Sequence, residues 1–186
     1  MIALSKPGPN VIKPEWIKSM ADKAIVFACA NPIPEIWPHA AKEAGAFIVA
    51  TGRGDFPNQV NNSLGFPGIL KGALIVRARK ITDSMAIAAA QALADFAEKR
   101  GITPDNIIPK MDETAVFPSE VAAVAKQAVQ EGIARRIITA ESAFQQAEVD
   151  IQTSRAMFQT LIKESFIKEL PESLLVSALE WAISQV

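Results

Sequence analysis

Two loops rich in asparagine, glycine and proline hold the side chains of this chain that are best suited to chemistry. The first, residues 28–35, contains Asn31, and the second, residues 51–68, contains the pair Asn61 and Asn62. Each loop follows a short apolar run, and α/β proteins bind ligands at such loops, where parallel strands end. An amide side chain can donate to a carboxylate and accept from a hydroxyl or a carboxamide. The two loops therefore predict one binding site to which all three asparagines contribute.

Each polar side chain in these loops also has a purely structural interpretation. Asn31 precedes Pro32 and could cap its own turn. Asn61 or Asn62 could cap a following helix, whose start would also favour an anion. Glu35 could order the Asn31 loop by accepting backbone N–H groups, or it could be solvated at the surface. The residue types alone leave these alternatives open.

The first third of the chain alternates apolar runs with helix-like segments. The apolar runs, each followed by turn residues, are 2–4, 24–30 and 46–50. Residues 14–21 and 38–44 between them are typical of helices, and Gly45 is suited to end the second. This β-α-β-α-β order predicts an α/β fold with a parallel sheet buried on both faces.

The following part of the sequence is typical of helices. Residues 62–76 predict a helix, which Pro67 would kink if the helix is continuous. A second helix is predicted over 82–100, from the N-cap residues Thr82 and Asp83 to Gly101. A third is predicted over 119–131, with Ser119 as its cap.

Residues 139–186 predict a helical tail. An apolar stripe recurs at spacings of mostly three and four along a helix of roughly thirty residues: Phe144, Ala147, Ile151, Ser154, Phe158, Leu161 and Phe166. Pro171 breaks this helix, and a final amphipathic helix follows. Because exposed apolar stripes usually mark an interface, we expect 139–186 to be an oligomerisation element that makes the chain a homo-oligomer, a dimer or larger. Folding of the tail back onto residues 1–136 is the alternative.

Composition and charge restrict the partners. The chain has 186 residues, 49% of them hydrophobic, which suffices for a core. Lys and Arg number 19 against 20 Asp and Glu, so the net charge of -1 makes no electrostatic case for nucleic acid or an anionic membrane. No run approaches the roughly 18 apolar residues of a membrane span, and no secretory signal is recognisable. We expect a cytoplasmic protein that binds small molecules or other protein chains.

Four motifs are longer and more specific than these patterns. They are Ala30-Asn31-Pro32-x-Pro34-Glu35-Ile36, residues 51–68, Gly72-Ala73-Leu74 and Ile107-Ile108-Pro109-Lys110. They resemble motifs of the malic enzymes, the NAD(P)-dependent malate oxidoreductases, and most closely those of the shorter bacterial and archaeal type. The resemblance covers the chain from Ile2 to Arg136. It departs from the usual pattern at Gly54, commonly Ser, and at Ile75, commonly Asp, and neither departure affects the asparagines.

This resemblance implies an enzyme that oxidises malate with NAD or NADP and decarboxylates it to pyruvate, using Mg²⁺ or Mn²⁺. It also implies that Asn31 and Asn62 contact malate and the nicotinamide end of the cofactor, and it favours Asn62 over Asn61 as the ligand. Ser5 closes the first strand, where folds of this kind place the ribose and diphosphate of the cofactor. A plain Pro-Gly turn explains the position of Ser5 equally well.

Several parts of such an enzyme have no counterpart in this sequence. No strand is followed by the G-x-G-x-x-G/A turn that binds a dinucleotide diphosphate, and the chain contains no Tyr. The resemblance places the catalytic Tyr and Lys of the family, and the carboxylates that hold its metal ion, upstream of the matched region. We therefore expect residues 1–136 to be the C-terminal half of a Rossmann-like, doubly wound parallel sheet. Such a chain would be inactive alone and would require a separate N-terminal half.

Two other interpretations remain. The product of a truncated or split gene could serve only as a non-catalytic interaction module that assembles through residues 139–186. Another oxidoreductase of related fold, such as an amino-acid dehydrogenase, would need the same absent glycine turn. The sequence leaves the choice between NAD and NADP open, because the residue that reads the 2′ position follows the second strand of such a domain, upstream of Met1.

Overall fold

The computed structural model describes residues 1–4, 6–168 and 170–184 of the chain. The chain forms two compact units, Met1–Ala147 and Glu148–Val186. The first unit contains all the strands of the described residues and most of the helices.

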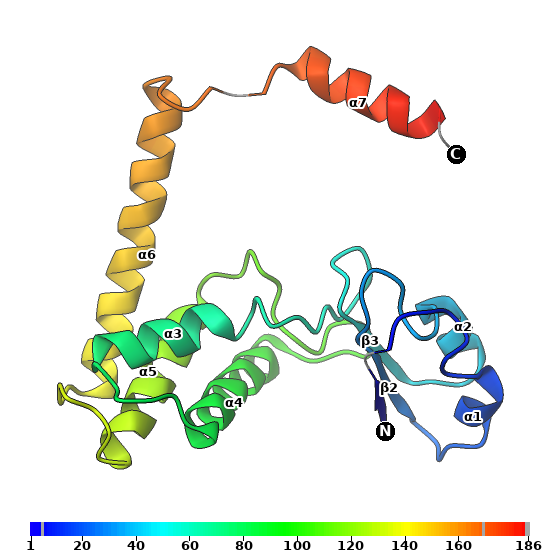
Figure 1. The fold of residues 1–186 in the computed structure, drawn as a ribbon, viewed down its shortest axis with the longest axis horizontal. Helices are drawn as coiled ribbons and strands as arrows, with labels where there is room; N and C mark the ends of the chain where they lie inside the picture. Colours follow the sequence, from blue (N-terminus) through cyan, green and yellow to red (C-terminus); the bar gives the residue numbers. More distant parts are fainter. Residues whose placement is uncertain (5, 169, 185–186) are drawn as a thin grey trace. The chain divides into compact units, whose positions relative to one another are not determined.

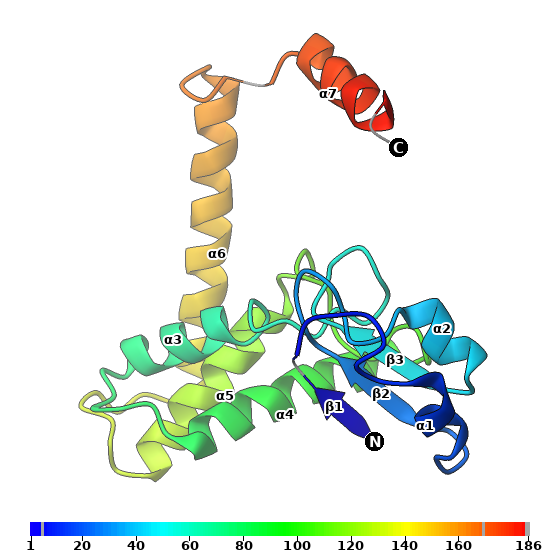
Figure 2. The ribbon, with the colours of Figure 1, turned by 45° about the vertical axis from the view of Figure 1, so that its right-hand side comes forward.

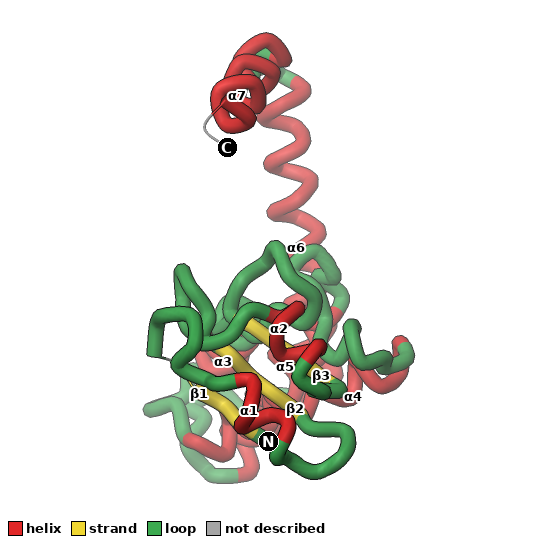
Figure 3. The backbone as a smooth tube through the Cα atoms, turned by 90° about the vertical axis from the view of Figure 1, so that its right-hand side faces the viewer, coloured by secondary structure: helices red, strands yellow, loops and turns green. Residues whose placement is uncertain are grey.

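A parallel sheet of three strands forms one part of the first unit (Figure 3). Its strands β1 (Ile2–Leu4), β2 (Ile25–Ala28) and β3 (Ile48–Thr51) lie in the order β1-β2-β3. Ala28 pairs with Leu4 on one side and with Thr51 on the other, so the three carboxyl ends are level with one another. The sequence-based prediction of an α/β fold with a parallel sheet is confirmed.

Helices α1 (Pro14–Lys18) and α2 (Pro38–Glu43) cover one face of this sheet (Figure 1). Each has Pro in its first turn, where the missing N–H group has no cost. A buried core joins helices and sheet, and its members include Ile17, Val26, Ala41 and Val49. The alternate strand residues Ile25, Phe27 and Ile48 are only partly buried. The described residues therefore cover the second face incompletely, in contrast to the prediction of a sheet buried on both faces.

Helices α3 (Phe66–Ile75), α4 (Asp83–Arg100) and α5 (Val116–Gln130) form the other part of the first unit (Figure 2). The beginning of α6 (Ala140–Lys163) joins their core through Ala143 and Ala147. Helices α3 and α5 approach closely at Gly72, where a Cβ atom would lie 2.7 Å from Val124 Cβ. The absence of a side chain at Gly72 lets the two backbones pack together.

The predicted boundaries were right for α4 and wrong for α3 and α5. Thr82 caps α4 by accepting a hydrogen bond from the Met85 amide at 3.3 Å, and Gly101 follows its last residue. Helix α3 begins at Phe66, so Pro67 lies in its first turn and does not kink it. Helix α5 begins at Val116, before the predicted cap Ser119, because its proline also falls in the first turn.

The second unit contains the rest of α6 and helix α7 (Glu172–Ser184). Helix α6 has 24 residues and ends at Lys163, so the predicted helix of nearly thirty residues was too long, and Phe166 lies outside it. Ser165 has a positive φ of 59°, which directs the chain out of the helix. Every residue of α7 within the described part of the chain is exposed. No helix of the described residues is long and apolar enough to cross a bilayer.

Candidate functional site

Asn31 lies directly against Gly52, the first residue after β3. A Cβ atom placed on Gly52 would be 2.7 Å from Asn31 Nδ2 and 2.9 Å from the carbonyl oxygen of Cys29. Strands β2 and β3 are parallel neighbours, so the loops that follow them meet at the same edge of the sheet. The side chain of Asn31 is exposed and makes no hydrogen bond among the described residues.

Asn61 contacts the same glycine but uses its amide within the loop. Its Nδ2 donates to the carbonyl oxygen of Gly52 at 3.2 Å, and its Oδ1 accepts from the amide of Ser63 at 3.0 Å. Each end of the side chain therefore makes one hydrogen bond within the loop. Asn61 thereby closes the 51–62 loop.

Asn62 differs from its neighbour. Its backbone carbonyl accepts from the amides of Gly65 and Phe66 at 3.1 and 3.0 Å, so Asn62 leads into α3. Its side chain is exposed and, like that of Asn31, makes no hydrogen bond within the part of the chain that the structure describes. Ser5, the remaining residue predicted for the site, lies outside the described residues.

Glu35 holds the loop that carries Asn31. Its side chain is 0% exposed; Oε1 accepts from the amide of Lys6 at 2.7 Å and Oε2 from the amide of Ala30 at 3.2 Å. Of the two interpretations left open for Glu35, the ordering role is confirmed and surface solvation is wrong. Burial, and to a lesser degree the charge of Glu35, raises the pKa of the Cys29 thiol, which keeps that thiol protonated at neutral pH.

Asn58 is a structural residue that the sequence patterns did not indicate. It is 6% exposed, and its Nδ2 donates to the carbonyl oxygens of Val49 at 3.0 Å and Pro104 at 2.8 Å, while its Oδ1 accepts from the amide of Ile107 at 2.9 Å. Asn58 thereby fixes the 103–108 loop to β3. Its positive φ of 57° is one that asparagine tolerates, and the preceding Pro57 is the local signal of such a turn.

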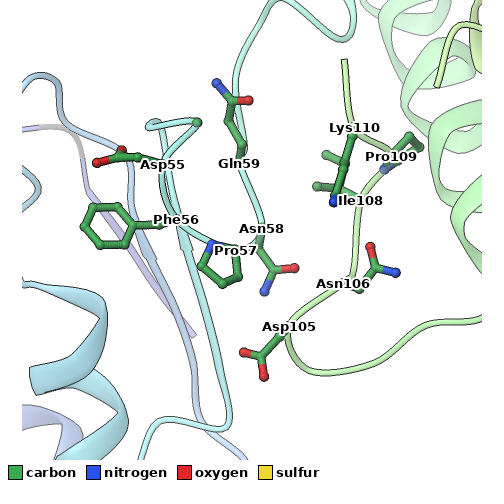
Figure 4. A pocket seen from close by; sticks show the side chains of 11 residues that line it. Asp55, Phe56, Pro57, Asn58, Gln59, Asp105, Asn106, Ile108, Pro109 and Lys110 are labelled. Carbon is green, nitrogen blue, oxygen red and sulfur yellow. The ribbon is translucent and has the colours of Figure 1, made fainter. Parts of the chain in front are cut away.

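A cavity of about 410 Å³ lies between the loop that carries Asn58 and the loop that follows α4 (Figure 4). Residues 54–59, 105, 106 and 108–110 line it, and its charged side chains are Asp55, Asp105 and Lys110. Neither Asn31 nor Asn62 belongs to the lining. The cavity is therefore distinct from the surface that these asparagines present.

The described residues offer no metal site. No three His, Cys, Asp or Glu side chains among them gather closely enough to hold an ion. Asp112 and Glu113 are adjacent carboxylates, but Glu113 is paired with Arg100.

Comparison with known proteins identifies the family of this chain. Residues 2–129 match the family model of the malic enzyme, NAD binding domain. The bifunctional malic/malolactic enzyme of Bacillus subtilis (strain 168) is 50% identical over 127 residues, which cover 68% of this chain and 31% of that enzyme. Other relatives are NAD-dependent or NADP-dependent malic enzymes. The chain spans about a third of the length of these relatives.

Solved structures of malic enzymes are similar to this chain as well. The crystal structure of Entamoeba histolytica malic enzyme superimposes with a TM-score of 0.93 and 62% identity, covering 98% of this chain and 38% of that one. The malic enzyme from Pyrococcus horikoshii OT3 gives a TM-score of 0.81 and 50% identity, covering 88% of this chain and 37% of that one. Parallel strands with polar loops at their carboxyl ends are typical of dinucleotide-binding domains, and the chain belongs to the malic enzyme family.

Proposed function

We propose that this chain works as part of an enzyme that oxidatively decarboxylates malate to pyruvate with NAD or NADP and a divalent metal ion. Its own contribution is to orient malate and the nicotinamide through Asn31 and Asn62. One observation carries this proposal: both side chains are exposed without a hydrogen-bond partner among the described residues, while Asn61 is occupied by the loop.

An uncharged amide suits this role. A bound nicotinamide would supply the acceptor for the hydride that leaves C2 of malate. The amides of Asn31 and Asn62 can donate to the carboxylate of malate and accept from its hydroxyl or from the carboxamide of the cofactor. They place the reacting carbon without adding a charge that would retain the product, and such orientation is worth large factors in rate.

The remaining catalytic groups belong, on this proposal, to another part of the enzyme. The chain contains no Tyr and no glycine turn for the dinucleotide diphosphate. Within the described ranges no group of three or more His, Cys, Asp or Glu side chains gathers, and on this proposal the metal ligands come from another part of the enzyme. The incompletely covered face of the sheet, with Ile25, Phe27 and Ile48 partly exposed, is a surface against which such a part could pack.

The isolated chain provides the first test. We expect it to bind dinucleotide weakly and to show no malate-dependent reduction of NAD or NADP with Mg²⁺ or Mn²⁺. An enzyme that contains this chain together with an N-terminal part should show that activity and release pyruvate. Turnover by the isolated chain at ordinary enzyme rates would contradict the proposal that the other catalytic groups lie in another part of the enzyme.

Substitution of Asn62 tests the role of the site. In the complete enzyme, Asn62→Ala should lower kcat/KM by about 10²-fold, corresponding to roughly 2 to 3 kcal/mol of lost orientation. Gln91→Ala, which removes an exposed amide from α4, is the matched control and should leave kcat/KM unchanged. Equal values of kcat/KM for Asn62→Ala and the unaltered enzyme would show that Asn62 does not orient the substrate.

A second candidate function is assembly without catalysis. Its support is the apolar surface of α7, where Leu174, Leu179 and Trp181 are 55%, 62% and 68% exposed. We infer that residues 139–186 bind a second copy of the chain. If the enzyme proves inactive with malate while the chain still assembles, this function alone would remain.

A further inference from the structure

Arg53 connects the two loops of the candidate site. Its Nε and one terminal nitrogen donate to the two carboxylate oxygens of Asp55 at 2.8 and 2.6 Å. Its other terminal nitrogen donates to the carbonyl oxygen of Pro32 at 2.6 Å. Asp55 lies in the loop after β3 and Pro32 in the loop after β2. The guanidinium group therefore spans the gap between the loops with charge-assisted hydrogen bonds.

Two aromatic rings hold the guanidinium group in place. Its carbon lies 5.9 Å from the centre of the Trp37 ring and 5.4 Å from that of Phe56, and these two rings lie 6.1 Å apart. Trp37 lies at the start of α2, directly after the first loop, and Phe56 lies in the second loop, so the aromatic contacts bridge the same gap. The side chain of Arg53 is only 30% exposed. The cation–π contacts and the bidentate pairing with Asp55 together restrict the movement of the group.

The backbone of Arg53 is fixed as well. Its amide donates to Oγ1 of Thr51 at 3.2 Å, and Thr51 is 0% exposed at the end of β3. The position of Arg53 is thus set by the sheet. A group anchored in this way can impose its geometry on the more exposed loop that it contacts.

The hydrogen bond from Arg53 to the carbonyl oxygen of Pro32 lies next to Asn31, a residue of the proposed site. Asn31 immediately precedes Pro32, and its amide lies against Gly52, the neighbour of Arg53. Two consecutive residues of the second loop therefore hold two consecutive residues of the first. A shift of the Pro32 carbonyl would carry Asn31 with it.

We propose that Arg53 is a positioning residue that sets the orientation of Asn31 toward the substrate. This inference rests on the proposed function of Asn31. Arg53 itself contacts Asp55 and Pro32 and acts only through the loop. Lysine cannot replace it, because an ammonium group lacks the planar fork that binds a carboxylate and a carbonyl at the same time.

A double-mutant cycle in the complete enzyme tests the proposal. Arg53→Met and Asn31→Ala should each lower kcat/KM by about 10- to 100-fold. The double variant should be no slower than Asn31→Ala, because Arg53 has nothing left to orient. Arg53→Lys retains the charge and most of the side chain, and it should show the same loss as Arg53→Met. Arg135→Met, which removes an exposed arginine, should have no effect.

Additive losses in the double variant would overturn the proposal, because Arg53 would then act independently of Asn31. Full activity of Asn31→Ala would contradict the proposed function instead. A second measurement then decides the positioning claim separately. The side-chain amide resonance of Asn31 in a ¹⁵N-labelled sample should shift in Arg53→Lys and stay in place in Arg135→Met. An unchanged resonance in Arg53→Lys would overturn the positioning role.

Discussion

Gly52 has no room for a side chain, because groups on two sides already occupy the place where one would begin. One is the movable amide of Asn31, and the other is the carbonyl oxygen of Cys29, which belongs to the backbone at the end of β2 and cannot move without the strand. The glycine thus allows the two loops of the site to approach each other.

Gly52→Ala should therefore displace Asn31. We expect kcat/KM of the complete enzyme to fall by about tenfold or more, because orientation of the substrate is sensitive to shifts of an ångström. Gly54→Ala is the matched control in the same loop, since its Cβ atom would meet only the flexible end of Gln59 at 3.3 Å. Equal kinetics for both variants would show that the contact between Gly52 and Asn31 has no catalytic importance.

At the level of single residues, the sequence predicted where some side chains lie but not which contacts others make. The amides at the strand ends were predictable because parallel strands bring consecutive loops to one edge. The contacts of Arg53 were not, since they depend on how two loops lie against each other. The buried acceptor role of Glu35 was one of two open alternatives, because a carboxylate followed by apolar residues occurs both buried and solvated.

At the scale of elements, α3 and α5 pack around an unusual carboxyl group. Glu120 in α5 is 0% exposed, and neither of its oxygens has a hydrogen-bond partner among the described residues. It faces Gly68 of α3, where a Cβ atom would lie 2.6 Å from Glu120 Oε2. Burial raises the pKa of Glu120 from 4.5 to about 8, so the group is largely protonated in the folded protein at neutral pH.

This raised pKa makes the packing of α3 and α5 pH-dependent. Because the folded state retains the proton at higher pH than the unfolded state, the contribution of Glu120 to stability is full below pH 4.5 and is lost as the pH rises through about 8. In this range the free energy of unfolding should fall by up to about 1.4 kcal/mol per pH unit on account of this group. Glu120→Gln should remove that slope in urea unfolding, while Glu98→Gln, at an exposed position of α4, should retain it. Identical slopes for the two variants would contradict the burial of Glu120.

The N-cap of α4 gives a second prediction about the stability of a helix. Thr82→Ala removes the hydroxyl that accepts from the Met85 amide and should lower the free energy of unfolding by about 1 kcal/mol. Thr82→Ser retains the hydroxyl and should lower the free energy of unfolding much less. The sequence predicted this cap because it is a local signal. The starts of α3 and α5 were mistaken because Pro67 and Pro118 fit the first turn of a helix as well as a kink or a loop.

At the scale of the whole molecule, the second compact unit exposes more apolar surface than an isolated chain tolerates well. Phe158 in α6 and Leu175 in α7 are 51% and 55% exposed. We therefore expect light scattering to give a dimer or larger species, through a contact that buries on the order of 1,000 Å² or more. Phe158→Asp together with Leu175→Asp should dissociate it. A clean monomer of 20.0 kDa at tens of micromolar would contradict the interface.

On the proposed function, this chain presents Asn31 and Asn62 to malate and the nicotinamide. The most direct measurement is a crystal structure of the complete enzyme with malate and the reduced cofactor, a combination that cannot react. We expect each asparagine amide to lie within about 2.7 to 3.2 Å of a polar atom of malate or of the nicotinamide. A complex in which both ligands bind in the active site and neither asparagine contacts them would contradict it.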